Sequence, residues 1–82
     1  MDIREEIIST LAERAARMFA IDRDGLGPDT RFEEDLNSTS VNIVQFTAAL
    51  EDIYEIEVPF MEFKRKSTFA EAADYVAGLL GL

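Results

Sequence analysis

The chain has 82 residues, with 8 Lys or Arg, 17 Asp or Glu and a net charge of −9. This length supports one modest hydrophobic core rather than two, so we expect a single domain over residues 1–82. The negative charge opposes binding to nucleic acid and to anionic membranes and favours basic protein partners, although it equally serves solubility.

Neither Cys nor His occurs in the sequence. Disulfides and thiolate metal sites are therefore excluded, and the commonest general base and metal ligand is missing. The acidic N-terminus, MDIREEIIST, lacks the basic start and apolar run of a signal peptide. No apolar run approaches the roughly 18 residues of a membrane span. We expect a soluble, cytoplasmic protein that is a monomer.

Apolar residues at helical spacing predict a first helix over residues 3 to 19. They are Ile3, Ile7, Ile8, Leu11, Ala15, Met18 and Phe19. The next stretch, IDRDGLGPDTR, is rich in Gly, Pro and Asp and cannot continue a helix. We expect a long loop that packs down through Ile21, Leu26 and Phe32, because loops of this length in small domains are usually packed or functional.

A second helix is predicted from residue 40 to residue 54. Thr39 is its expected N-cap, because the hydroxyl oxygen can accept a hydrogen bond from the backbone N–H of Val41 or Asn42. The residues expected to face inward are Ile43, Phe46, Thr47, Leu50, Ile53 and Tyr54. The residues expected to face outward are Gln45, Ala48, Glu51 and Asp52.

Two further helices follow. Pro59 can open a short helix over FMEFKR, because proline is tolerated at the first helical position. Thr68 and Glu71 form a capping box for a final helix that fades at Gly81. The sequence thus predicts an all-α fold, an antiparallel bundle of three main helices plus one short helix, with a long loop between the first two. The expected main core residues are Phe32, Phe46, Leu50, Tyr54, Phe69 and Val76.

Most catalytic chemistry is absent from the sequence. There is no Gly-rich phosphate loop, no His or Cys nucleophile system and no zinc-protease motif. Glu33 and Glu34 are neighbours in sequence and are better explained as a solvated surface than as an acid–base pair. DRDGLGPDTRFEED has scattered oxygen ligands but lacks the spacing of a calcium loop. We expect a protein that is not an enzyme and binds no metal.

Three hydroxyl residues, Ser38, Thr39 and Ser40, precede the second helix. One hydroxyl is enough to cap a helix, and capping alone would explain such a cluster in most proteins. Ser40 stands where the free N–H groups and the positive end of the helix dipole favour a phosphate. This position permits modification of Ser40 without requiring it.

The pattern F-x-x-D-L-x-x-x-S, at Phe32, Asp35, Leu36 and Ser40, resembles the prosthetic-group motif of the acyl carrier protein family. The following VNIVQFTAALEDIYEIEVP is similar to that family's second helix and its exit through a Val-Pro pair. The last helix also fits the family, at Thr68, Ala72, Asp74 and Tyr75. The resemblance covers nearly the whole chain.

This resemblance implies that Ser40 carries 4'-phosphopantetheine, attached by a separate phosphopantetheinyl transferase that uses coenzyme A. The arm ends in a thiol that holds an acyl group as a thioester, and acyl-transferring or synthase enzymes act on it. The implied docking residues are Thr39, Val41, Asn42, Gln45, Ala48, Glu51 and Asp52. The implied acyl pocket consists of Ile43, Phe46, Thr47, Leu50 and Phe63.

The sequence departs from the family pattern at several positions. Thr39-Ser40-Val41 replaces the usual D-S-L, and Asn42 and Gln45 replace residues that are often acidic. Lys64, Arg65 and Lys66 stand where acidic or apolar residues are usual. These changes count against a housekeeping role in fatty acid synthesis and suggest a specialised carrier with its own partners. The pathway implied by the resemblance is fatty acid synthesis or a specialised lipid or polyketide pathway. An aminoacyl or peptidyl carrier and an unmodified protein-interaction module remain alternatives.

Overall fold

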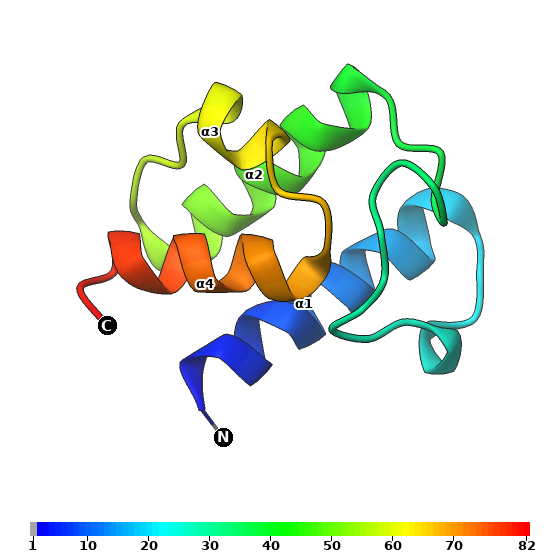
Figure 1. The fold of residues 1–82 in the computed structure, drawn as a ribbon, viewed down its shortest axis with the longest axis horizontal. Helices are drawn as coiled ribbons and strands as arrows, with labels where there is room; N and C mark the ends of the chain where they lie inside the picture. Colours follow the sequence, from blue (N-terminus) through cyan, green and yellow to red (C-terminus); the bar gives the residue numbers. More distant parts are fainter. Residues whose placement is uncertain (1) are drawn as a thin grey trace.

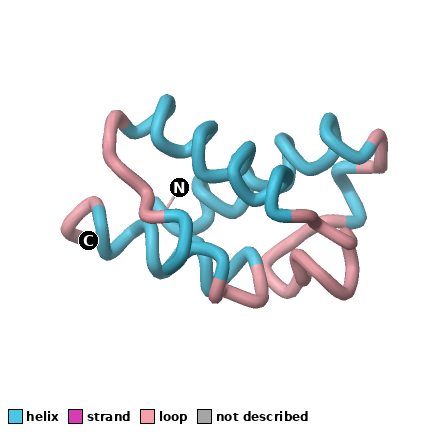
Figure 2. Tube along the Cα trace, turned by 90° about the horizontal axis from the view of Figure 1, so that it is seen from above, coloured by secondary structure: helices cyan, strands magenta, loops and turns pink. Residues whose placement is uncertain are grey.

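The computed structural model describes residues 2–82 and contains four α-helices and one short 3₁₀ helix. In chain order these are α1 (Ile3–Phe19), η1 (Arg23–Gly25), α2 (Ser40–Tyr54), α3 (Phe60–Lys64) and α4 (Phe69–Leu79). Figure 1 shows a helical bundle in which the long connection between α1 and α2 runs along one end. Figure 2 shows the same loop gathered at that end of the molecule. The predicted all-α fold is confirmed.

The helix boundaries follow from local sequence signals. α1 and α2 begin and end where the apolar periodicity and the cap at Thr39 predict. Pro59 precedes α3 as its N-cap residue, and Thr68 caps α4 by accepting a hydrogen bond from the Glu71 N–H at 3.1 Å. The Glu71 carboxylate accepts from the Ser67 N–H at 2.9 Å, one residue before the position that a capping box requires. Glu71 therefore fixes the connection between α3 and α4 as well as the helix start.

The core lies between α1, α2 and α4, with α3 packed against α2. Five of the six predicted main core residues are buried: Phe32, Phe46, Leu50, Phe69 and Val76. Tyr54 is only half-buried, because its hydroxyl donates a hydrogen bond to Glu6 Oε2 of α1 at 2.8 Å. Burial and this bond to a carboxylate raise the pKa of Tyr54 to about 12.

The prediction that Ile53 and Ile21 pack inward is wrong. Ile53 is 51% exposed and Ile21 is 40% exposed. In the last turn of α2 the position four residues after Leu50 is Tyr54, and Tyr54 rather than Ile53 reaches α1. Ile21 follows the left-handed Ala20 that ends α1, so it no longer lies on the apolar face of that helix.

Phe32 joins the loop to three helices. Its ring centroid lies 5.3 Å from that of Phe46 in α2, 5.6 Å from that of Phe63 in α3 and 5.1 Å from that of Phe69 in α4. The contacts with Phe46 and Phe63 are edge-on, a favourable arrangement for aromatic rings. Only 2% of Phe32 is exposed. The long loop is therefore part of the core rather than a free connection.

Backbone hydrogen bonds fix the same loop to the connection between α3 and α4. Phe32 N–H donates to the carbonyl of Ser67, and Phe69 N–H donates to the carbonyl of Thr30, each at 3.0 Å. Together they form an isolated antiparallel bridge between Arg31 and Thr68. Residues 31–36 and 64–67, far apart in sequence, are thereby held side by side next to the start of α2.

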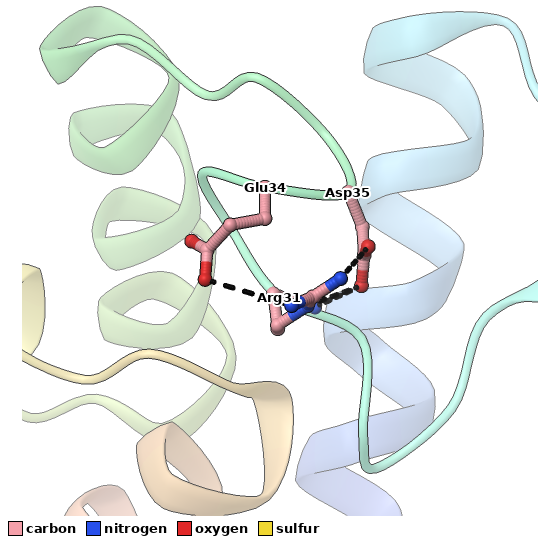
Figure 3. Close-up of polar contacts among 3 residues, drawn as sticks. All are labelled: Arg31, Glu34 and Asp35. Carbon is pink, nitrogen blue, oxygen red and sulfur yellow. Dashed lines mark hydrogen bonds and ion pairs between the residues drawn. The ribbon is translucent and has the colours of Figure 1, made fainter.

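Arg31 stabilises the turn that follows the bridge, as Figure 3 shows. Its guanidinium donates to Asp35 Oδ1 at 3.0 Å and to Oδ2 at 3.3 Å, and it lies 3.9 Å from Glu34. Asp35 Oδ2 also accepts from the Arg31 N–H at 2.8 Å. The hydrogen bonds from Arg31 lower the pKa of the Asp35 carboxyl below its usual range.

Replacing Leu50 with Ala should destabilise the domain by about 2–5 kcal/mol, because it empties fully buried space in α2. A urea titration followed by circular dichroism should show a clearly lower midpoint. Ile53→Ala is the matched control, since it shortens an exposed aliphatic residue of the same helix and should change the midpoint much less. Equal losses for the two variants would show that the inward face of α2 is misassigned.

Arg31→Gln should raise the pKa of Asp35 toward its ordinary value, because the guanidinium that favours the ionised form is lost. A folded-state pKa below the unfolded value gives stability that is present above the unfolded pKa and lost as pH falls through the folded pKa. The variant should therefore lose less stability than the native protein on acidification. Side-chain carboxyl NMR titration checks the pKa, with Arg17→Gln in α1 as the control. An unchanged Asp35 titration in Arg31→Gln would contradict the assignment.

Candidate functional site

The start of α2 is built by a reciprocal pair of hydrogen bonds. Thr39 Oγ1 accepts from the Asn42 N–H at 3.3 Å, and Asn42 Oδ1 accepts from the Thr39 N–H at 2.8 Å. This is a capping box in which Asn takes the place of the usual Glu or Gln. The predicted cap at Thr39 is confirmed, and Asn42 has a structural task that its sequence position did not reveal.

The three hydroxyl residues before and at the helix start have different surroundings. Thr39 serves as the cap. Ser38 Oγ is buried and has no hydrogen-bond partner among residues 2–82. Ser40 is the first residue of α2 and is exposed. Of the three, Ser40 is the hydroxyl residue that is both open to solvent and not needed for the cap.

A pocket of about 410 Å³ opens beside Ser40. One side consists of Phe32, Glu33 and Glu34 from the long loop, and the other consists of residues 64–67 from the end of α3. Ser38, Thr39, Ser40 and Ile43 complete it. The backbone bridge between the loop and the α3–α4 connection therefore creates the two walls of this pocket.

The pocket carries both signs of charge. Glu34 lies 3.9 Å from Arg31, and Arg65 lies 3.7 Å from Glu62. Lys64 and Lys66 make no ion pair within 4.0 Å in the described part of the chain. Lys64 Nζ lies 5.9 Å from the centroid of the Phe60 ring, and Lys66 Nζ lies 5.1 Å from that of Tyr75. These two ammonium groups remain available to an anion.

Burial raises the pKa of the Tyr75 hydroxyl, with a smaller contribution from the negative charge of Glu62. Tyr75 therefore stays neutral and presents an uncharged aromatic ring to Lys66, the arrangement that a cation–π contact requires. This contact keeps the stem of Lys66 against α4 near the pocket.

The residues expected to form an acyl pocket lie mostly in the closed core. Phe46, Leu50 and Phe63 are fully buried and Thr47 is 5% exposed. Ile43, one turn into α2, is the member of this group that lines the pocket beside Ser40. Ile43, Phe46, Leu50 and Phe63 belong to one buried cluster, but the pocket beside Ser40 is bordered mainly by polar side chains.

The expected docking residues on α2 differ in their exposure to solvent and in their hydrogen bonds. Val41, Gln45, Ala48 and Asp52 are exposed. Gln45 Oε1 accepts from the Asn42 side chain at 3.3 Å. Glu51 is half-buried, and its carboxylate accepts from the Val58 N–H at 2.8 Å, so it stabilises the turn before α3.

Two exposed apolar residues beside this face were not anticipated from the sequence. Val44 is 50% exposed on α2 and Met61 is 62% exposed on α3. The spacing of Val41 and Val44, three residues apart on the outward side of α2, was a signal that could have identified the first of them.

Within residues 2–82 no group of three or more acidic side chains is placed to hold a metal ion. The same part of the chain has no helix with the length and apolar character needed to cross a membrane. A covalent group is compatible with the site, because an exposed hydroxyl residue, an unpartnered buried hydroxyl and two free ammonium groups border one pocket.

Comparison with known proteins agrees with this geometry. Residues 9–76 match the family model described as a phosphopantetheine attachment site. The chain is 33% identical over 72 residues to an acyl carrier protein of Lactobacillus johnsonii, covering 88% of this chain and 90% of the relative. It is 34% identical over 73 residues to an acyl carrier protein of Rubrobacter xylanophilus, covering 89% and 90%. An acyl carrier protein of Helicobacter hepaticus is 30% identical over 76 residues, covering 93% and 95%.

The family match spans the loop, the start of α2, α3 and most of α4, so it includes every segment that builds the pocket. It indicates a covalently bound phosphopantetheine group and a carrier rather than a catalyst. The protein belongs to the acyl carrier protein family.

Proposed function

We propose that this protein carries acyl intermediates on a 4'-phosphopantetheine arm attached to Ser40. The observation that carries the proposal is the position of Ser40, exposed at the first residue of α2 beside a pocket with free ammonium groups. The Oγ of Ser38 is buried and Thr39 is occupied as the cap, so neither competes well for the modification.

Attachment requires an accessible serine oxygen and a partner that supplies the group. Ser40 Oγ gives up its proton and bonds to phosphorus, while the pyrophosphate bond of coenzyme A breaks and adenosine 3',5'-bisphosphate leaves. The start of α2 favours the resulting negative charge, because its free N–H groups and dipole are positive there. When bound, the group supplies a thiol that holds an acyl chain as a thioester.

The acyl chain would lodge between α2 and α3. Ile43 supports this, because it both lines the pocket beside Ser40 and belongs to the buried cluster that contains Phe46 and Phe63. Since Phe63 is fully buried, a chain that enters this region must displace its ring. The proposed cargo is an acyl intermediate of fatty acid, other lipid or polyketide synthesis.

The exposed side of α2 is the proposed docking surface for transferases and synthases. Val41, Val44 and Met61 supply apolar contacts, and Asp52 supplies negative charge. The net charge of −9 favours a basic partner, since complementary charge accelerates encounter. An unmodified module that binds proteins through this face is the alternative function, and the mass of the protein distinguishes the two.

Ser40→Ala should abolish modification, because it removes the proposed attachment atom. The native protein, incubated with coenzyme A and a broad-specificity phosphopantetheinyl transferase, should gain one phosphopantetheine by intact mass spectrometry. Ser38→Ala should still gain it and serves as the matched control. A native protein that stays unmodified, or a Ser40→Ala variant that gains the group, would refute the proposal.

Asp52→Asn should slow phosphopantetheine transfer at low salt, because it removes an exposed charge from the proposed docking surface. The loss should shrink as ionic strength rises, since screening weakens attraction between exposed charges. Asp29→Asn removes the same charge from an exposed loop position outside the docking surface and should have less effect. Equal initial rates for the two variants at low salt would exclude Asp52 from docking.

A further inference from the structure

We infer that Lys64, Lys66 and Ser38 hold the phosphodiester that joins the arm to Ser40, so that the base of the arm lies against the α3–α4 connection. This inference rests on the proposed attachment at Ser40.

The covalent bond to Ser40 limits the positions that the negative charge of the phosphodiester can take. The phosphorus of the attached group is bonded directly to Ser40 Oγ, so its two unesterified oxygens stay within a bond length or two of that atom. Ser40 borders the pocket of about 410 Å³ that Lys64 and Lys66 also line. The negative charge is therefore confined to the space that these flexible ammonium groups border.

Among residues 2–82, the ammonium groups of Lys64 and Lys66 are not held by carboxylates, so they can turn toward a phosphate. Within the described residues neither has a carboxylate within 4.0 Å, whereas Arg65 is engaged with Glu62 at 3.7 Å. Their present neighbours are aromatic rings, and a cation–π contact can persist while the ammonium group also donates to a phosphate oxygen. Lysine is a common phosphate ligand because its three donors form a compact charge.

The wall that carries the lysines is held in place by the fold. Phe63, just before Lys64, is fully buried, and the Ser67 carbonyl, just after Lys66, accepts from the Phe32 N–H at 3.0 Å. The backbone that carries Lys64 and Lys66 is thus fixed, and only the two side chains must reorient to reach the phosphodiester.

Ser38 provides the second, independent indication. Its Oγ is buried at the pocket, and it has no hydrogen-bond partner among residues 2–82. A buried hydroxyl without a partner is unfavourable, and most such groups are satisfied in folded proteins. A phosphodiester oxygen at the neighbouring Ser40 is an acceptor of suitable charge for this O–H.

The acidic wall opposite directs the phosphodiester toward the lysines. Glu34 is partly compensated by Arg31 at 3.9 Å, but Glu33 has no ion pair in the described part of the chain. Repulsion from Glu33 and attraction to Lys64 and Lys66 act in the same direction across the pocket. The asymmetry predicts an arm whose base bends toward α3 and α4.

NMR of the apo and holo proteins tests this arrangement, after mass spectrometry shows that each holo sample is fully loaded. In the native protein, attachment should change the backbone amide shifts of residues 64–67 as well as those next to Ser40. Lys64→Gln with Lys66→Gln should shift the ³¹P resonance and should remove most of the change at residues 64–67. Ser38→Ala should also shift the ³¹P resonance.

The matched control is Arg14→Gln with Arg17→Gln, which removes two positive charges from α1, away from the pocket. It should leave the ³¹P resonance close to its native position, and all apo variants should keep the native circular dichroism. Added salt should move the native ³¹P resonance toward that of the lysine variant. Equal ³¹P shifts in the lysine and arginine variants, or no change at residues 64–67 on loading, would overturn the inference. Absence of phosphopantetheine on the native protein would instead overturn the proposed function on which it rests.

Discussion

The insertion of Phe32 among the rings of Phe46, Phe63 and Phe69 is the contact on which the rest of the structure depends. Ordering a long loop costs conformational entropy, and only contacts made by the loop itself can offset that cost. Here one side chain joins the loop to α2, α3 and α4 at once, with ring separations of 5.1–5.6 Å. Without it, α3 and the loop would each lose their main apolar contact.

The same insertion determines the shape of the site. Burial of Phe32 places its backbone N–H against the Ser67 carbonyl, and the adjacent bridge aligns Arg31 with Thr68. The loop wall and the α3 wall of the pocket are therefore positioned by one side chain and a few backbone hydrogen bonds. The start of α2, where Ser40 lies, is therefore next to two walls whose backbones are fixed relative to each other.

Local signals made the helices predictable, and tertiary contacts explain what was missed. Periodicity and the Thr39 and Thr68 caps are encoded within a few residues, so the bounds of α1 and α2 and the start of α4 followed from them. The exposure of Ile53 depends on Tyr54 reaching Glu6, and the burial of Glu51 depends on the Val58 N–H. Family resemblance pointed to Ser40, but the pocket required the bridge between residues 31 and 68, which no short sequence window contains.

Because α3 is short, its stability depends on contacts with the rest of the fold. A helix of 5 residues is not stable alone, because nucleation is unfavourable and few bonds follow it. Its conformation therefore depends on the buried ring of Phe63, which packs against the ring of Phe32 at a centroid distance of 5.6 Å. Under the proposed function, an acyl chain that lodged between α2 and α3 would have to displace this ring, and the free energy lost in doing so would be subtracted from the affinity for the chain. The packing of one phenylalanine would then set the minimum binding free energy that a sequestered chain must supply.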